Sequence, residues 1–109
     1  MGLLDFLGKE LTVNEGINRA RSEKGAVLLD VRRKEDFKKG YVAGAINVPL
    51  ERLDNVKNRI RDLSAPIYVI GSYSDNPKEA VKKLKKMGYT QVICSGRMEE
   101  HYGLLKKQG

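Results

Sequence analysis

Cys94 is the one cysteine in the chain, and its thiol is the only side chain that could carry sulfur as a persulfide. The attacking form of a cysteine is the thiolate, so such chemistry needs a positive environment that lowers the pKa of the thiol. Arg97 and His101 follow within one or two helical turns and could supply that charge. The opposing interpretation is that a lone cysteine is a small buried hydrophobe, and no basic cluster is predicted around it.

Ser72, Ser74 and His101 are the other side chains with the chemistry of a nucleophile or a base. A serine hydroxyl is inert unless a base activates it, and a catalytic histidine needs a third group that orients it. No serine or cysteine lies at a spacing that predicts a partner for His101. We therefore expect turn formation and capping from the two serines, and a packing or surface role for His101.

The segment around these serines, residues 71–76, has the composition of a recognition loop. Tyr73 supplies rigid amphipathic contact area of the kind found in protein interfaces. Asp75 and Asn76 add polar groups beside it. We expect this loop to bind a protein or a small anionic ligand.

Basic residues outnumber acidic ones by 21 to 14, which gives a formal net charge of +7. Such a charge favours anionic partners or simply keeps a small protein in solution. The lysines between Lys78 and Lys86 predict a solvated helix face, because no aromatic residues interleave with them to stack on bases. We expect no nucleic-acid partner, and a basic module that binds nucleic acid or acidic lipid is kept as a third hypothesis.

A single cysteine cannot form an internal disulfide, and with a single histidine it offers no metal-ligand cluster. We therefore expect no metal, no cofactor and a reducing, cytoplasmic location. The length of 109 residues and the hydrophobic content of 40% predict one domain over 1–109, as a monomer or weak homodimer. Residues 1–10 form an N-terminal extension without the features of a signal peptide, and no stretch predicts a membrane span.

Hydrophobic periodicity predicts strands that alternate with helices. Short apolar runs, typical of strands buried on both faces of a parallel sheet, occupy residues 26–31 and 67–70. Two further short strands are expected over residues 45–48 and 91–94. Helices are expected over residues 12–25, 34–39 and 77–87. The first has capping-box spacing at Thr12 and Glu15, and the last begins with Asn76 and Pro77. This alternation favours an α/β architecture.

Two further helices are predicted from apolar residues at intervals of three and four. The first is a long helix that buries Leu53, Val56, Ile60 and Leu63. The second is a closing helix lined by Met98, Tyr102 and Leu105.

Residues 28–50 carry an ordered run of residue types that resembles the rhodanese family. The run reads LLDVRRKEDFKKGYVAGAINVPL. The family pattern is Leu-Asp-Val-Arg, an acidic and aromatic pair, and then Gly-His-Ile-Pro-Gly-Ala-Ile-Asn-Ile-Pro. Residues 87–92, Met-Gly-Tyr-Thr-Gln-Val, are similar to the family's Leu-Gly-Tyr-x-x-Val. The resemblance implies a rhodanese-like three-layer fold, with a central mostly parallel sheet of about five short strands flanked by helices on both faces.

The resemblance also implies a loss at the active-site loop. In the family, the strand that corresponds to residues 67–70 ends in a cysteine that carries a persulfide, cradled by loop amides and an arginine. The family loop commonly reads Cys-x-Ser-Gly-x-Arg-Ser, whereas residues 71–77 read Gly-Ser-Tyr-Ser-Asp-Asn-Pro. Gly71 thus replaces the nucleophile, the loop arginine is missing, and Asp75 puts negative charge where the family needs positive charge.

These departures imply a rhodanese-like domain that is inactive as a sulfurtransferase at this loop and acts as a binding or regulatory module. By the same resemblance, Asp30 and Arg32 have a structural or loop-supporting role beneath this loop. The simpler interpretation, which we favour, is a buried ion pair. The alternative is a sulfurtransferase or sulfur carrier that uses Cys94. We expect binding to be centred on Gly71, Ser72, Tyr73, Ser74, Asp75 and Asn76.

Overall fold

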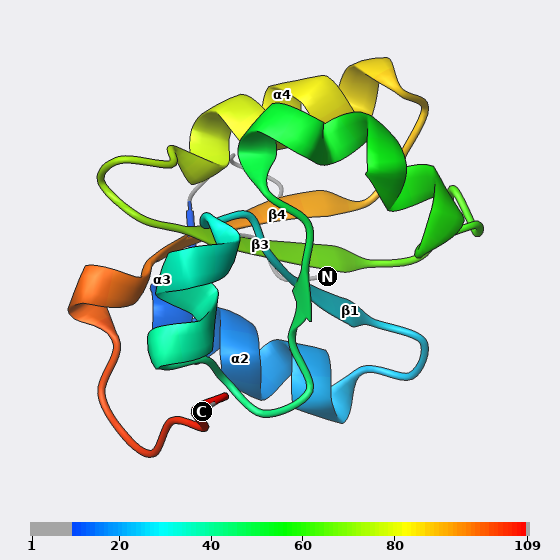
Figure 1. The fold of residues 1–109 in the computed structure, drawn as a ribbon. Helices are drawn as coiled ribbons and strands as arrows, with labels where there is room; N and C mark the ends of the chain where they lie inside the picture. The colour runs from blue at the N-terminus through cyan, green and yellow to red at the C-terminus, as the bar shows by residue number, and fades with distance from the viewer. Residues whose placement is uncertain (1–9, 109) are drawn as a thin grey trace.

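Four parallel strands form the centre of the fold in the computed structural model, which describes residues 10–108 (Figure 1). Neighbouring strands follow the order β2-β1-β3-β4, and all of their pairings are parallel. The predicted α/β class with a parallel sheet is confirmed, but the expected count of about five strands is wrong. The strands are β1 (Val27–Asp30), β2 (Ile46–Asn47), β3 (Ile67–Gly71) and β4 (Val92–Arg97).

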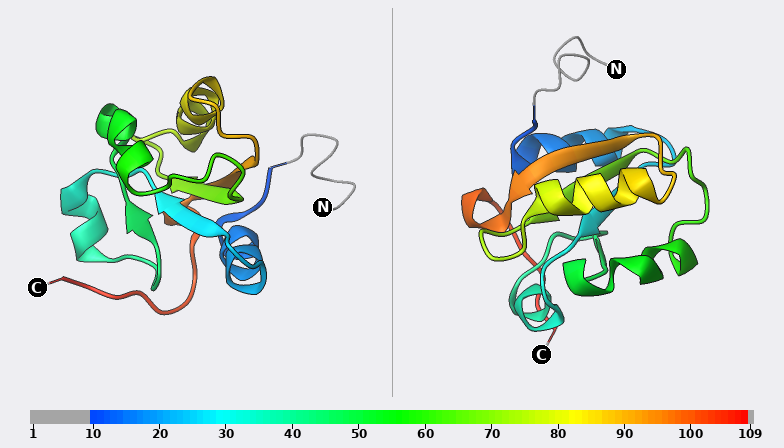
Figure 2. Two further views of the ribbon diagram at one scale, coloured as in Figure 1. Left: turned by 90° about the vertical axis from the view of Figure 1, so that its right-hand side faces the viewer. Right: turned by 90° about the horizontal axis from the view of Figure 1, so that it is seen from above.

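Helices cover both faces of this sheet (Figures 1 and 2). The helix α2 (Val13–Ser22) lies on one face, while α4 (Pro77–Lys86) and the 3-10 helix η1 (Leu50–Asn58) lie on the other. The short helix α3 (Lys34–Lys39) follows β1. Parallel strands cannot be joined by tight turns, so β1, β2 and β3 are each followed by a crossover, which carries α3, η1 and α4 in turn.

Alternate residues of the central strands feed two separate cores, because successive side chains of a strand point to opposite faces. Leu29 and Val69 pack with residues of η1 and α4 in one core. Leu28 and Ile70 pack with residues of α2 in the other. Burial on both faces explains why β1 and β3 are almost wholly apolar, and all five residues of β3 are buried.

The predicted helix starts are confirmed. The Thr12 hydroxyl accepts a hydrogen bond from the backbone N–H of Glu15, and the Glu15 carboxylate accepts one from the N–H of Thr12. At α4, the Asn76 side chain accepts from the backbone N–H of Lys78, and Pro77 occupies the first helical position. Both helices therefore begin where side chains satisfy their free N–H groups.

The predicted long helix through Leu63 is wrong in kind and in extent. The segment is a 3-10 helix that ends at Asn58, and its backbone is non-helical at Arg52. Leu63 is 45% exposed, because the chain turns at Asp62, whose side chain accepts hydrogen bonds from Ser64. After this turn, the backbone carbonyl of Leu63 accepts a hydrogen bond from the backbone N–H of Thr90. The Leu63 side chain does not complete the apolar stripe.

The predicted closing helix is also wrong. Only a short 3-10 helix, η2 (Met98–Glu100), follows β4. Tyr102 is exposed and exchanges hydrogen bonds with the side chain of Asn14. The helix ends because the backbone of His101 is extended. Gly103 then adopts a positive φ of 111°, and the chain runs on to an isolated bridge between Lys106 and Tyr41.

Close contact between α2 and β4 depends on Gly16. A Cβ atom added at this position would lie 2.4 Å from both Cβ and Oγ of Ser95. Ser95 is fully buried, and its backbone belongs to the strand, so neither element can yield without moving the other. The residue pair thus fixes how closely the helix approaches the sheet.

We expect Gly16→Ala to lower the free energy of unfolding by about 1–3 kcal/mol, because the added methyl group overpacks this contact. Asn18→Ala is the matched control, since Asn18 is exposed on the same helix and should change stability by no more than about 0.5 kcal/mol. Urea denaturation followed by circular dichroism measures both. Equal stability of the two variants would show that α2 shifts away from β4 at little cost.

Candidate functional site

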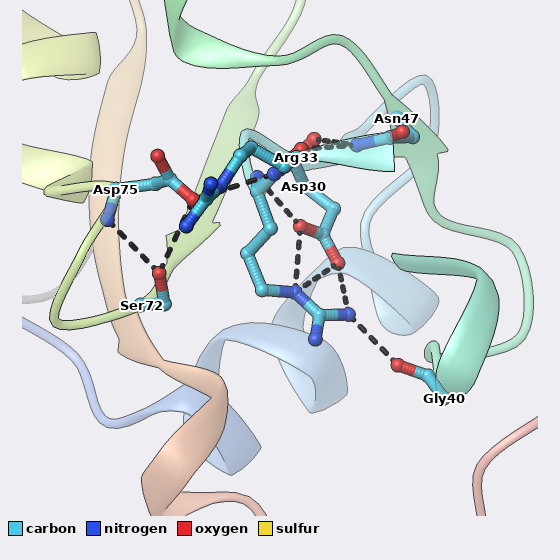
Figure 3. Close-up of polar contacts among 7 residues, drawn as sticks. Asp30, Arg33, Gly40, Asn47, Ser72 and Asp75 are labelled. Carbon is cyan, nitrogen blue, oxygen red and sulfur yellow. Dashed lines mark hydrogen bonds and ion pairs between the residues drawn. The ribbon is translucent and has the colours of Figure 1, made fainter. Parts of the chain in front are cut away.

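The carboxyl ends of β1 and β3 lie side by side, because Asp30 pairs with Ile70 in the parallel ladder. In open α/β sheets, ligands bind at this edge. The chain leaves β1 through Arg32 and Arg33, and it leaves β3 at Gly71 to enter the loop that leads to α4. The residues that the sequence singled out at 30–32 and 71–76 therefore gather at one edge of the sheet (Figure 3).

Asp30 and Arg32 form an ion pair that is closed off from solvent. Asp30 is 0% exposed, and the Nη2 atom of Arg32 lies 2.9 Å from Oδ2 of Asp30. Nε of Arg32 lies 3.0 Å from Oδ1, which also accepts a hydrogen bond from the backbone N–H of Arg32 at 3.0 Å. Burial raises the pKa of the Asp30 carboxyl above its usual range, and the Arg32 guanidinium opposes that rise.

This ion pair connects neighbouring segments (Figure 3). Nη2 of Arg32 donates a hydrogen bond to the carbonyl of Gly40, at the end of α3. The Asn47 side chain in β2 donates to the carbonyls of Asp30 and Arg32, both at 2.9 Å. The sequence did not single out Asn47 as a site residue. The available signal was a polar residue at the end of a predicted strand. Because that strand pairs with β1, Asn47 lies at the same sheet edge as Asp30.

The loop after β3 closes on itself. The backbone N–H of Ser72 donates to the carbonyl of Asp75 at 3.0 Å, and the N–H of Asp75 donates to the Ser72 hydroxyl at 2.9 Å. The Asp75 carboxylate accepts a hydrogen bond from the backbone N–H of Arg33 at 3.3 Å (Figure 3). These contacts pin the loop to the segment that follows β1. Arg33 was not predicted as a site residue, because only its backbone takes part in this contact.

Gly71 has no room for a side chain in this closed loop. A Cβ atom built on its backbone would lie 2.2 Å from the carbonyl oxygen of Asp75 and 2.8 Å from Cδ of Pro77. Real Cβ atoms essentially never approach other heavy atoms so closely. The observed path of the loop therefore requires glycine at residue 71.

Tyr73 is an exposed residue of the loop, and contacts with Arg97 and Glu99 restrain it. The residue is 67% exposed, and the guanidinium carbon of Arg97 lies 5.1 Å from the centre of the tyrosine ring. The backbone N–H of Tyr73 donates to the Glu99 carboxylate at 3.1 Å. A cation over an aromatic ring and a tethered backbone both restrain the ring.

The two remaining loop residues, Ser74 and Asn76, have different roles. Asn76 caps α4, as predicted. Ser74 is exposed and lines two grooves on either side of the loop, with volumes of about 440 Å³ and 420 Å³. Within residues 10–108, no hydrogen bond joins the side chain of His101 to Ser72 or Ser74, while the Ser72 hydroxyl donates a long hydrogen bond of 3.5 Å to the Asp75 carboxylate.

Cys94 lies in β4, opposite Val69 of the neighbouring strand, and not in the loop. The thiol is half-buried, and this burial raises its pKa above the ordinary value. The backbone N–H of Gly96, and then Lys78 and Arg97, favour the thiolate and lower the pKa, but burial, helped by the charge of Glu10, outweighs them. Across residues 10–108, no group of three or more His, Cys, Asp or Glu side chains could hold a metal ion.

Comparison with known sequences places the chain in a family. A model of the rhodanese-like domain matches residues 14–96. The uncharacterized protein YqhL of Bacillus subtilis is 37% identical over 81 residues, which are 74% of this chain and 63% of that protein. The thiosulfate sulfurtransferase PspE of Escherichia coli is 29% identical over 73 residues, which are 66% of this chain and 70% of that protein.

Solved structures agree with this assignment. A rhodanese from E. coli, determined with anions, superposes with a TM-score of 0.68 at 26% identity, over 75% of this chain and 98% of the other. A rhodanese-like domain protein from Staphylococcus aureus superposes with a TM-score of 0.69 at 22% identity, over 93% of this chain and 99% of the other, which supports the fold alone. The family match over residues 14–96 and the shared parallel-sheet fold show that the chain belongs to the rhodanese-like domain family.

Proposed function

We propose that this rhodanese-like domain is a binding or regulatory module that does not transfer sulfur at the loop after β3. The observation that carries the proposal is the crowding at Gly71, where a Cβ atom would lie 2.2 Å from the Asp75 carbonyl oxygen. A persulfide at this position needs a cysteine side chain, and the closed loop leaves no space for one. Loss of the nucleophile and closure of the loop are therefore consistent with each other.

The loop amides support the same proposal. An anion or thiolate in a loop is stabilised when several backbone N–H groups point at it without other partners. Here the N–H groups of Ser72 and Asp75 bond within the loop, and the N–H of Tyr73 bonds to Glu99. Three of the loop's backbone donors are thus already used. The Asp75 carboxylate adds negative charge beside them.

Binding at the loop is centred on Tyr73 in this proposal. The ring is exposed and restrained by Arg97, and the neighbouring Ser74 lines two grooves. A restrained aromatic side chain loses little conformational entropy when a partner covers it, which is why tyrosine is common in recognition surfaces. Asp30 and Arg32 have a supporting role beneath the loop, through the segment that holds Asp75. A protein or a small ligand with a polar surface would fit this arrangement.

We also propose that the protein works in a reducing, cytoplasmic environment. Cys94 is a free thiol and the only cysteine of the sequence, which is consistent with a reducing, cytoplasmic environment. No helix in residues 10–108 is both long and apolar enough to cross a bilayer.

Incubation with thiosulfate and cyanide tests the main proposal. We expect no thiocyanate formation above the uncatalysed rate, and no gain of one sulfur in the intact mass, because the loop offers no thiol. The Cys94→Ser variant should behave like the wild-type protein. Turnover that disappears in Cys94→Ser would overturn the proposal and establish the alternative, a sulfurtransferase or sulfur carrier that uses Cys94. The name of the similar E. coli protein, thiosulfate sulfurtransferase, makes this the assay of choice.

Restoring the family cysteine tests the role of loop closure. We expect Gly71→Cys to lower the free energy of unfolding by about 1–3 kcal/mol, because its Cβ overpacks the loop, and to give negligible sulfur transfer. Ser74→Cys is the matched control, since it puts a thiol in an exposed position of the same loop without crowding. Wild-type stability together with turnover in Gly71→Cys would show that the loop opens at little cost.

Alkylation separates the two roles of Cys94. Because burial raises the pKa of this thiol, we expect the iodoacetamide rate to reach half its maximum above pH ~8.5, the value for a free cysteine. At pH 7 the wild-type protein should therefore react more slowly than the Cys94→Ser/Ser74→Cys variant, whose only thiol is exposed. A half-maximal rate well below the free-thiol value would instead favour sulfur chemistry at Cys94.

A further inference from the structure

A groove runs beside the loop between α3 and η1. Its volume is about 790 Å³, and the side chains that line it come from α3, from the end of β2 and from η1. Arg33, Pro49 and Glu51 also line one of the smaller grooves beside the loop, so the two hollows adjoin. We call this hollow the α3–η1 groove.

The α3–η1 groove is lined by more cations than anions. Five basic side chains line it, against two carboxylates, Glu35 and Glu51. None of the five forms an ion pair within residues 10–108, and all five residues are exposed. Their charges are thus free to act on a ligand. The five are Arg33, Lys34, Lys38, Arg52 and Arg59.

An extended polypeptide already contacts one rim of this groove. Tyr41 and Lys106 exchange backbone hydrogen bonds at 2.9 Å and 2.8 Å, and the N–H of Gln108 donates to the carbonyl of Lys38 at 2.9 Å. Gln108 itself lines the groove. The rim therefore accepts extended backbone, and the segment that lies there brings further positive charge from Lys106 and Lys107.

The aromatic residues of the groove are not arranged for stacking on bases. Phe37 and Tyr41 stack on each other with their ring centres 4.4 Å apart, and Phe37 is buried. Single-stranded nucleic acids gain much of their affinity from bases that stack on exposed rings, which this groove lacks. Its size also exceeds what a small inorganic anion would fill. An extended chain with several carboxylates matches both the volume and the charge of the groove.

We propose that the α3–η1 groove binds an acidic segment of a partner protein, with Arg52 and Arg59 of the η1 side and Lys34 and Lys38 of the α3 side facing its carboxylates. Complementary charge of this kind mainly sets the rate and specificity of association. This surface lies outside the loop, so the proposal can hold or fail independently of the function proposed above.

Binding of a fluorescein-labelled hexaglutamate peptide, followed by fluorescence anisotropy, tests this proposal. At about 50 mM salt we expect saturable binding that weakens steeply by about 200 mM, because exposed charges are screened over these concentrations. Removing two groove cations in R52A/R59A should raise Kd at least about fivefold. K82A/K86A is the matched control, since it removes the same charge from exposed positions of α4 that do not line the groove, and should change Kd less than about twofold.

Three results would overturn the proposal. They are equal weakening in both double variants, no binding of hexaglutamate by the wild-type protein, or tighter binding of a single-stranded oligonucleotide of equal charge. Thermal unfolding should be similar in the two double variants, because all four side chains are exposed. Y73A is expected to leave Kd unchanged, since Tyr73 does not line the groove, and a loss there would move the peptide site to the loop.

Discussion

At the carboxyl end of β1, a carboxylate and a guanidinium are withdrawn from water together. Burying either charge alone would cost several kcal/mol, so each is tolerable only because the other neutralises it at 2.9 Å. The geometry is restrictive, since Arg32 must reach back to Asp30 while also bonding to the Gly40 carbonyl. The requirement fixes where the chain turns after β1, and Asn47 fixes β2 against the same turn.

The loop after β3 is placed by this arrangement. The Arg33 N–H that holds the Asp75 carboxylate is positioned by the turn that Asp30 and Arg32 create, so the ion pair and the loop are mechanically connected. Asp75 also disfavours the ionised form of Asp30, because the two carboxylates interact unfavourably. The loop thus places a negative charge at a sheet edge where binding of an anion would require positive charge. The backbone N–H of Arg33 and the buried guanidinium of Arg32 compensate for this negative charge.

The sequence predicts the parts of this structure that depend on local chemistry. Thr12 with Glu15, and Asn76 with Pro77, mark helix starts because a capping side chain needs only its neighbours. The close pair Asp30 and Arg32 is local in the same way. Closure over Gly71 was not predictable, since the obstructing atoms belong to Asp75 and Pro77 in a turn that only the folded loop creates. Tyr102 and Leu105 kept helical spacing but lacked a surface to pack on.

Fold and chemistry are separable in this domain because they depend on different residues. The two cores draw on the strands, α2, η1 and α4, and none of the exposed loop residues belongs to either core. A glycine at the end of β3 lets the loop bond to itself, which satisfies its own polar groups and so removes the energetic reason to hold an anion there. Reopening the loop would break those hydrogen bonds before any ligand replaced them. The closed state is therefore self-consistent, and a cysteine side chain at residue 71 would require Asp75 and Pro77 to move.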